Sequence, residues 1–316
     1  MCESLKQNKH PYITGGDSAT GISHIKSKTP NQDHHIIISE DHYTILCVAD
    51  GHGSKIHFRS DIGSKIATEI TAELLISFVE DTYQKQSKEP FHERINRLRK
   101  NIISHWRDRI NQHMKTHPIE IKKVIHENHI INDEDVIKQV TNENLLLDDK
   151  DSFVLSALDF KSILENPLKA YGTTLLAVLL FDEGIVCIQI GDGDIRFIDQ
   201  RQMIKIMEDE HELFANETYS LSSIDAYEHL NIVYTNFLPE FVFLSTDGIK
   251  NSFTVESDFE LLGFELLKEC VQNPEELNKS LKTLLNNFAE KGSGDDCTLC
   301  YAININNLKK ENNTWD

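Results

Sequence analysis

The sequence lacks any hydrophobic run long enough to cross a membrane. Its 316 residues contain no stretch that approaches the roughly eighteen apolar residues of a membrane-spanning helix. The N-terminal segment, MCESLKQNKHPY, has no apolar core of the kind that a signal peptide needs. We therefore expect a cytoplasmic chain that does not insert into membranes.

Basic residues are scarce relative to acidic ones. Lys and Arg number 32 against 51 Asp and Glu, which gives a formal net charge of −19 at pH 7. A field of that sign repels nucleic acid and anionic membranes. The charge balance therefore argues against both as partners, and an anionic ligand would need a site where bound cations reverse the local field.

Cysteine is also rare, and its six residues are scattered along the chain. Four of them lie inside apolar runs such as ILCVAD and GIVCIQI, which is typical of reduced core residues. Cys297 and Cys300 form a C-x-x-C pair. In a strand-like run, however, residues three apart face opposite sides, and no second pair lies nearby to complete a zinc site. We interpret this pair as structural.

The first half of the chain combines a hairpin with two helices. Apolar runs at Ile36–Ser39 and Tyr43–Ala49, joined by a polar turn, predict two antiparallel strands. Apolar residues then recur every three or four positions over 62–78 and 91–114, which predicts two amphipathic helices. From about 119 to 151 the pattern loosens, and we expect broken helix and loop.

The second half carries strands at antiparallel meander spacing and two further helices. Grouped blocks of strands and helices favour an α+β fold with layered sheets over alternating βαβ units. No internal repeat or flexible linker is visible, which favours one domain. The predicted strands are 173–181, 184–190, 194–199, 202–207, NIVYT, FVFLS and TLCYAIN, and the helices are Glu256–Cys270 and Pro274–Glu290, the second capped by Asn273.

Aspartates fall at the ends of the predicted strands, and all but one have a glycine beside them. Like charges that converge at one edge of a sheet are costly unless cations neutralise them. A set of oxygen ligands suits magnesium or manganese better than zinc. The aspartates are Asp33 before the first predicted strand, Asp50 after TILCVA, Asp192 after IVCIQIG, Asp247 after FVFLST, and Asp295 and Asp296 before CTLCYA.

Other candidate sites are weaker. The stretch DGHG that begins at Asp50 would, taken alone, be an ordinary surface turn. The stretch GDGDIRFID lacks the spacing and the final Glu of a calcium loop. His126 and His129 in HENH do not form H-E-x-x-H and have no third ligand nearby. His34 and His35 point to opposite faces of a strand, so at most one would reach a shared site.

Six short motifs resemble, in order, the metal-dependent protein phosphatases of the 2C type, also called the PPM family. The motifs are NQD, VADGHGS, YGTTLLAV, QIGDGDI, FLSTDGI and GSGDDCTL. The stretches GISHIKSKTPNQD and ANETYSLSS are most similar to the bacterial branch. The resemblance implies a four-layer αββα sandwich of two antiparallel sheets between helix pairs. It implies one phosphatase domain over 1–316 with a core of about 21–303. The region of about 83–168 is longer than a minimal member needs and would offer a substrate or partner surface.

The resemblance also implies a centre of two manganese or magnesium ions, with a third, weaker ion. Such a pair, about 3.5 to 4 Å apart, activates a water molecule as nucleophile and holds the phosphoryl oxygens. His52 would donate a proton to the leaving alkoxide. In this scheme Asp50 bridges both ions, the Gly51 carbonyl binds one, Asp247 and Asp295 hold the other, Asp33 lies in the outer shell, and Asp192 helps to bind the third ion.

Three positions depart from the family pattern. Many relatives have an arginine where this chain has Lys28, with His24 nearby, so these two residues are the predicted phosphate ligands. Lysine pairs with phosphate as a point charge and cannot reproduce the bidentate fork of arginine. Gln32 and Asn251 replace acids that the family often carries, which weakens a third metal site.

These features predict a metal-dependent phosphatase that acts on phosphoserine or phosphothreonine in proteins, with a serine/threonine kinase as a partner. Two alternatives stay open. The departures at Lys28, Gln32 and Asn251 fit a catalytically weak pseudophosphatase that binds a phosphoprotein or kinase. The family also hydrolyses other phosphate esters, so a small-molecule phosphatase is the second alternative. Nothing in the sequence indicates an oligomeric state.

Overall fold

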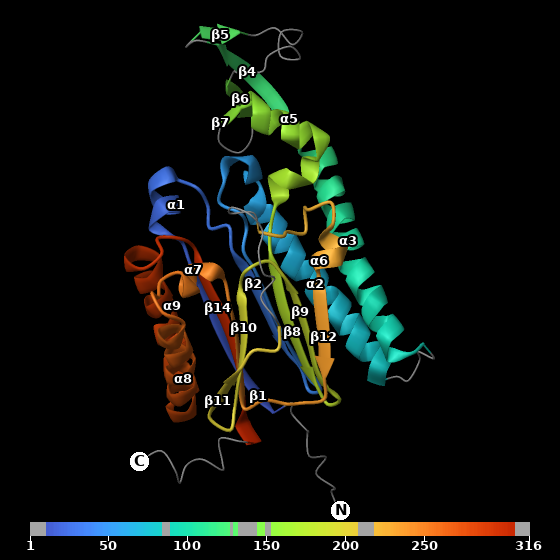
Figure 1. Cartoon of the computed structure of the whole chain (residues 1–316), viewed down its shortest axis with the longest axis vertical. Helices are drawn as coiled ribbons and strands as arrows, with labels where there is room; N and C mark the ends of the chain where they lie inside the picture. Colours follow the sequence, from blue (N-terminus) through green and yellow to red (C-terminus); the bar gives the residue numbers. More distant parts are fainter. Residues whose placement is uncertain are drawn as a thin grey trace, which may run out of the picture.

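The computed structural model describes residues 11–83, 89–126, 129–131, 144–148, 153–207 and 218–306. Two antiparallel five-stranded sheets pack face to face, and a pair of long helices covers the outer face of each (Figure 1). This confirms the predicted four-layer αββα sandwich. Among the described helices, none is both long and apolar enough to cross a bilayer. That the chain forms a single domain stays a prediction.

The first sheet has the strand order β1-β14-β13-β10-β11, and helices α8 and α9 pack on it. The predicted cap of α9 is confirmed, because the Asn273 side chain accepts a hydrogen bond from the Glu276 N–H. The elements are β1 (Tyr12–Ala19), β10 (Asp194–Asp199), β11 (Gln202–Ile204), β13 (Phe241–Ser245), β14 (Cys297–Asn304), α8 (Glu256–Gln272) and α9 (Pro274–Lys291).

The second sheet has the strand order β12-β9-β8-β3-β2. Helix α2 packs on β2, β3 and β8, and α3 packs on α2. The buried Trp106 of α3 donates a hydrogen bond from Nε1 to the Gly63 carbonyl of α2, at 3.0 Å. The elements are β2 (His34–Ser39), β3 (Tyr43–Ala49), β8 (Leu175–Phe181), β9 (Gly184–Ile190), β12 (Asn231–Thr235), α2 (Ser60–Tyr83) and α3 (Phe91–Thr116).

Three apolar cores fill the three spaces between the four layers. Along β3, Ile45 and Cys47 face α2 and α3, whereas Leu46 and Val48 face the other sheet. Strand β14 alternates in the same way, since Cys297 packs towards α8 and α9 and Cys300 packs between the sheets. The structure thus confirms that the C-x-x-C pair is divided between two faces. The described cysteines are free and buried.

The prediction of broken helix and loop over 119–151 is wrong for the residues described there, and the rest of that range lies outside the described residues. The backbone there forms strands of a separate small sheet with the order β5-β4-β6-β7. His126 and His129 lie opposite each other in paired strands, not on a helix. Figure 1 shows this sheet, with α5, at the end of the molecule beyond the C-terminus of α3. The elements are β4 (Glu120–His126), β5 (His129–Ile131), β6 (Asn144–Asp148), β7 (Phe153–Ser156), α5 (Ala157–Glu165) and the 3₁₀ turn η2 (Pro167–Tyr171).

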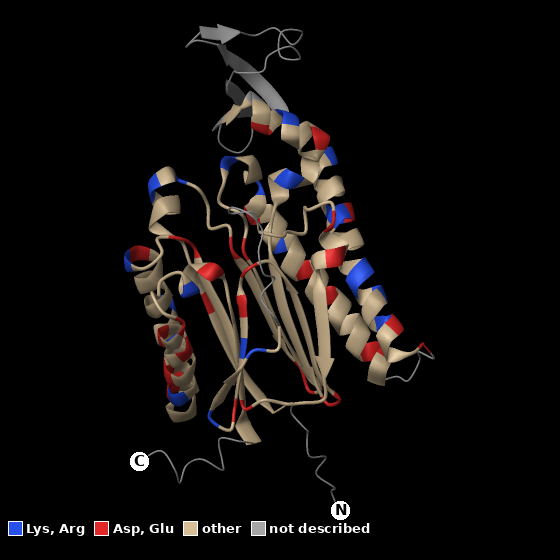
Figure 2. Cartoon of the chain, viewed as in Figure 1, with Lys and Arg blue, Asp and Glu red and all other residues tan. Residues whose placement is uncertain are grey.

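Strand ends from both sheets meet at one edge of the sandwich and bring acidic residues there, as the red segments at the upper strand ends in Figure 2 show. The second sheet contributes the start of β2, the end of β3 and the end of β9. The first contributes the start of β10, the end of β13 and the start of β14. The short elements at or near this edge are α1 (Ile22–Ser27), η1 (Lys55–His57), α6 (Ala226–His229) and α7 (Asp247–Lys250).

Candidate metal centre

Asp33 is buried at the centre of this edge with only one of its oxygens satisfied. Its Oδ2 accepts hydrogen bonds from Thr246 Oγ1 at 2.9 Å and from Thr298 Oγ1 at 2.7 Å. Its Oδ1 is buried and has no hydrogen-bond partner in the described structure. A carboxylate that is anchored by two hydroxyls and leaves one oxygen unsatisfied suits a bound cation or a water molecule held by one. This fits the outer-shell place predicted for Asp33.

The loop after β3 holds Asp50 and Gly51 through its backbone. The Asp50 carbonyl accepts hydrogen bonds from Thr174 N at 2.8 Å and Thr173 Oγ1 at 2.9 Å. The Gly51 N–H donates to the Gln32 carbonyl at 3.1 Å. A Cβ at Gly51 would lie 2.6 Å from that carbonyl oxygen, so only glycine fits. The backbone is therefore fixed on both sides, which leaves the Asp50 carboxyl free to act as a ligand.

Asp247 begins α7, directly after β13, and neighbouring side chains hold it there. Asn251 donates a hydrogen bond from Nδ2 to Asp247 Oδ2 at 2.9 Å. At the other end of α7, Lys250 Nζ lies 3.4 Å from Oδ2 of the buried Asp194. Asp194 also binds Arg196 through Oδ1, at 2.6 and 2.9 Å. This ion-pair network ties α7 to β10.

Electrostatic repulsion shows how closely the acids meet. Burial, followed by the charges of Asp33 and Asp247, raises the pKa of Asp50 well above its ordinary value. Burial and the charge of Asp296 also raise the pKa of Asp33. The hydrogen bonds from the two threonine hydroxyls lower this pKa but do not cancel the rise. Burial and the charge of Asp192 raise the pKa of Asp247 to about 6. The strand ends thus do converge, as the sequence predicted.

The residues at this edge fit divalent cations. The donors are carboxylate oxygens, which hard ions such as Mg²⁺ and Mn²⁺ prefer. The unsatisfied Oδ1 of Asp33 and the raised pKa values of Asp33, Asp50 and Asp247 are what a positive charge placed among them would relieve.

Asp295 and Asp296 differ in their surroundings. Asp296 is buried and accepts hydrogen bonds from Gly21 N at 2.8 Å and Gln32 N at 2.6 Å. Its Oδ2 also lies 2.9 Å from His24 Nδ1. The side chain of Asp295 is 55 % exposed, and its Oδ1 lies 3.9 Å from His24 Nε2. Asp296 therefore closes the loop over 21–32, whereas Asp295 is available as a ligand.

His24 and Lys28, the two predicted phosphate ligands, are placed differently. His24 is buried, and its Nε2 lies near Gly53, where a Cβ would be 3.6 Å from it. The hydrogen bond to Asp296 raises the pKa of His24. Lys28 ends α1 in a left-handed conformation, with φ of 60°, and its side chain is exposed. The structure thus brings His24, and not Lys28, to the edge of the acidic cluster.

Asp192 lies at the margin of the cluster. Its side chain is exposed and accepts a hydrogen bond from Thr218 Oγ1 at 2.7 Å. Its charge is nevertheless close enough to raise the pKa of Asp247. This position fits the peripheral place predicted for Asp192.

The pKa of His52 is lower than the near-neutral value that the sequence suggested. Burial, with a second contribution from His57, lowers the pKa of His52 to about 3, so the ring is neutral near pH 7. The two imidazole rings lie 4.8 Å apart between centroids. Gly172 packs against both, because a Cβ there would lie 2.7 Å from His52 and 2.5 Å from His57. A carbonyl of η2, that of Lys169, hydrogen-bonds to His57 Nδ1 at 2.5 Å.

Sequence reasoning missed the groups that hold the acids. Thr246 directly precedes the predicted ligand Asp247, and Thr298 follows Asp295 by three positions, so a nearby hydroxyl was the available signal. The pairing of His57 with η2, and of Lys250 with Asp194, joins residues far apart in the sequence and had no local signal.

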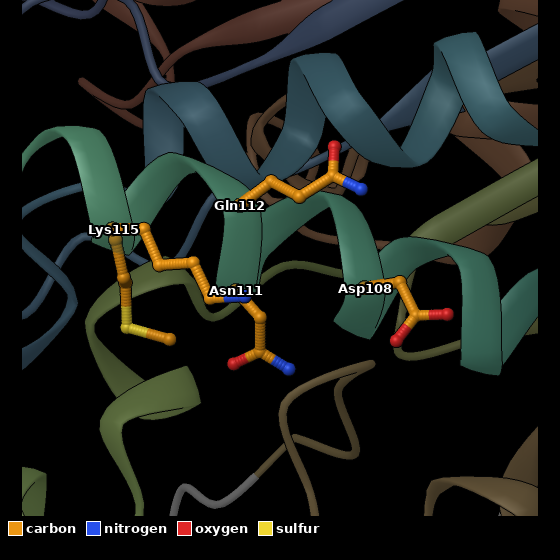
Figure 3. A pocket seen from close by; sticks show the side chains of 5 residues that line it. Asp108, Asn111, Gln112 and Lys115 are labelled. Carbon is orange, nitrogen blue, oxygen red and sulfur yellow. The ribbon is translucent and has the colours of Figure 1, made fainter.

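A pocket of about 620 Å³ lies elsewhere, along the outer face of α3 (Figure 3). Its lining is mostly polar, and none of the predicted site residues belongs to it. The acidic edge is therefore the candidate site. The lining residues are Asp108, Asn111, Gln112, Met114 and Lys115.

We predict that Asp247→Asn stabilises the cation-free protein near neutral pH. The folded-state pKa of about 6 exceeds the ordinary value of 3.8, so the charged carboxyl destabilises the fold above pH 6. This destabilisation disappears at pH values below the unfolded-state pKa of 3.8. Thermal unfolding in chelator should therefore show a gain of roughly 2 to 4 °C at pH 7.5 that shrinks as the pH falls from 6 towards 4.

The same variant should lose most of the stabilisation that Mn²⁺ gives the wild type, because it lacks one ligand charge. Asp108→Asn, at an exposed acid on α3, is the control and should change neither result. A lower melting temperature in chelator, or an intact response to Mn²⁺, would contradict this account of the cluster.

Comparison with known proteins gives the family. The protein phosphatase 2C family model matches residues 20–286. A search of curated proteins found no match. Among solved structures, the chain is similar to PppA, described as a key regulatory component of the T6SS in Pseudomonas aeruginosa. The identity is 15 %, over 93 % of this chain and 98 % of that chain, with a TM-score of 0.53.

The chain is also similar to the Mycobacterium tuberculosis serine/threonine phosphatase PstP/Ppp. The identity is 15 %, over 92 % of this chain and 98 % of that chain, with a TM-score of 0.51. At such identities the likeness shows the fold, whereas the family model covers most of the sequence. The chain therefore belongs to the protein phosphatase 2C family of metal-dependent serine/threonine protein phosphatases.

Proposed function

We propose that the chain hydrolyses phosphoserine and phosphothreonine in proteins at the acidic edge described above, with two Mn²⁺ or Mg²⁺ ions. The observation that carries the proposal is the convergence of Asp33, Asp50 and Asp247, whose pKa values are all raised by burial and by the charges of neighbouring aspartates. A partner kinase that supplies the phosphoprotein stays a prediction.

Each acid has a role that fits its surroundings. Asp50, fixed by its backbone, would contact both ions, and the Gly51 carbonyl would bind one of them. Asp247 and the exposed Asp295 would hold the other, and Asp33 would act through its unsatisfied oxygen. When bound, the ions supply an activated water nucleophile and neutralise charge on the phosphoryl group. Asp192 is the proposed ligand of a third ion, weakened because Asn251 offers no charge.

His24 is the proposed phosphate ligand of this chain. Asp296 holds one nitrogen of its ring, and the other faces the edge near Asp295 and Gly53. The carboxylate beside one ring nitrogen raises the pKa of His24 and so favours the imidazolium form, in which the other nitrogen carries an oriented N–H donor. Lys28, which is exposed, would contribute only long-range attraction.

His52 is the proposed proton donor to the leaving serine or threonine oxygen. Its depressed pKa opposes this role in the structure as described. A dianionic phosphoester beside the ring favours the protonated form, since nearby negative charge raises the pKa of a histidine. Protonation of His52 would then be coupled to substrate binding.

Asp50→Asn tests the phosphatase function itself. With Mn²⁺ present, we expect the wild type to hydrolyse both a phosphoserine peptide and an aryl phosphate, and the variant to lose at least about a thousandfold in kcat because charge stabilisation is lost. Phosphate release is the measurement. A wild type that binds Mn²⁺ but turns over neither substrate would support the pseudophosphatase alternative. Turnover of small phosphate esters but not of the peptide would support the small-molecule alternative.

His52→Gln should slow the phosphoserine peptide far more than the aryl phosphate. A serine alkoxide is a poor leaving group and needs the proton, whereas an activated phenolate leaves without it. We expect kcat to fall by about a hundredfold for the phosphoserine peptide and by less than about tenfold for the aryl phosphate. Equal losses on both substrates would show that His52 acts in some other way.

His24→Gln should raise the KM for the phosphoserine peptide and the inhibition constant of inorganic phosphate by about tenfold, because a charge-assisted hydrogen bond is lost. Lys28→Ala, four residues further along at the exposed end of α1, is the matched comparison and should change both values by less than about threefold. A larger effect of Lys28→Ala than of His24→Gln would show that Lys28, and not His24, binds the phosphate.

A further inference from the structure

Two segments that flank the candidate metal centre contain no acidic residue. One is 21–32, which carries α1, and the other is 51–60, which carries η1. Asp and Glu make up 51 of the 316 residues, but these two segments contribute no carboxylate of their own beside the centre. Both segments instead carry lysines, at Lys26, Lys28 and Lys55.

Both segments lie against the acidic edge. Segment 21–32 docks on the loop before β14, where Ser23 N donates to the Gly294 carbonyl at 3.2 Å and Gly21 N donates to Asp296. Segment 51–60 continues directly from Asp50, and its Gly51 N–H binds the Gln32 carbonyl. Figure 2 shows lysine-bearing turns (blue) above the acidic strand ends at this edge. The lysines therefore lie on segments that border the candidate metal centre.

These three lysines, called here the lysine rim, are all exposed. Within the described residues none of them forms an ion pair. Six other described lysines form ion pairs, whereas Lys100, Lys115 and Lys161 do not, so the rim is set apart by its place beside the centre. The paired lysines are Lys65 with Glu69, Lys205 and Lys250 with Asp194, Lys268 with Glu265, Lys279 with Glu276, and Lys282 with Asp17.

We propose that the lysine rim selects phosphosites that are flanked by acidic residues. The inference rests on the proposed phosphatase function and specifies its substrate class. A chain of net charge −19 repels an acidic peptide over most of its surface. Beside the centre, attraction comes from the rim, where the ammonium groups of Lys26, Lys28 and Lys55 meet flanking carboxylates while the phosphate enters the centre. The same field orients the approaching substrate.

The test compares two phosphoserine peptides that differ only in their flanks, one with glutamates and one with neutral residues. We expect the wild type to prefer the acidic peptide by about three- to tenfold in kcat/KM, through KM, since exposed charge pairs are individually weak. Raising the salt concentration should reduce the preference, because these charges are screened. The double variant Lys26→Glu/Lys55→Glu should abolish or reverse it.

Lys100→Glu/Lys279→Glu is the matched control, because it changes the net charge equally at exposed lysines on α3 and α9, outside the rim. It should keep the preference of the wild type. No preference in the wild type, or an equal loss in both double variants, would overturn the proposal.

A binding measurement separates this proposal from the phosphatase function. Fluorescence anisotropy of the two labelled phosphopeptides measures the selectivity of the rim even if neither peptide is hydrolysed. In that case the proposed phosphatase function fails, and the ratio of the two affinities still tests whether the rim prefers acidic flanks. Anionic lipid vesicles are the competing partner. Vesicle binding that the rim variant loses, together with equal affinity for the two peptides, would show that the rim serves a membrane surface instead.

Discussion

The burial of Asp33, Asp50 and Asp247 beside other aspartates is the constraint on which the rest of the structure depends. Three carboxyls meet at one edge of a sandwich, where burial and the charges of neighbouring aspartates raise the energy of their charged forms. A chain tolerates such an arrangement when its layers are firmly packed. Here three apolar cores fix the strands from which the acids emerge, and local partners hold each acid in place.

Local partners also divide the acids into structural and available ones. Asp296 and Asp194 are buried, and their oxygens bind backbone N–H groups, a histidine or basic side chains. They brace the loop over 21–32 and the short helix α7. Asp50 and Asp295 have their backbone neighbours satisfied but keep accessible carboxyls. The available acids are those that a cation would neutralise, which connects the fold to metal dependence.

Much of this could be predicted from the sequence, because the acids stand at strand ends and strand ends share an edge. Two parts could not. β1, YITGGDSA, has two glycines and an acid and gave no strand signal, yet all eight residues pair with β14. Its Gly15 and Gly16 serve close packing, since a Cβ would meet Asn278, Tyr301 or Cys300. The strands within 119–151 alternate weakly and were misread, because tertiary pairing overrides local propensity. The position of His24 likewise depends on its contact with Asp296, which is far away in the sequence.

The most direct measurement of the central claim is anomalous diffraction from crystals of the wild type soaked with Mn²⁺. The account predicts two strong peaks about 3.5 to 4 Å apart, one of them shared by Asp50 and Asp247, with Asp295 as a further ligand and Asp33 one water molecule away. Peaks only at surface carboxylates, with none beside Asp50, would contradict it.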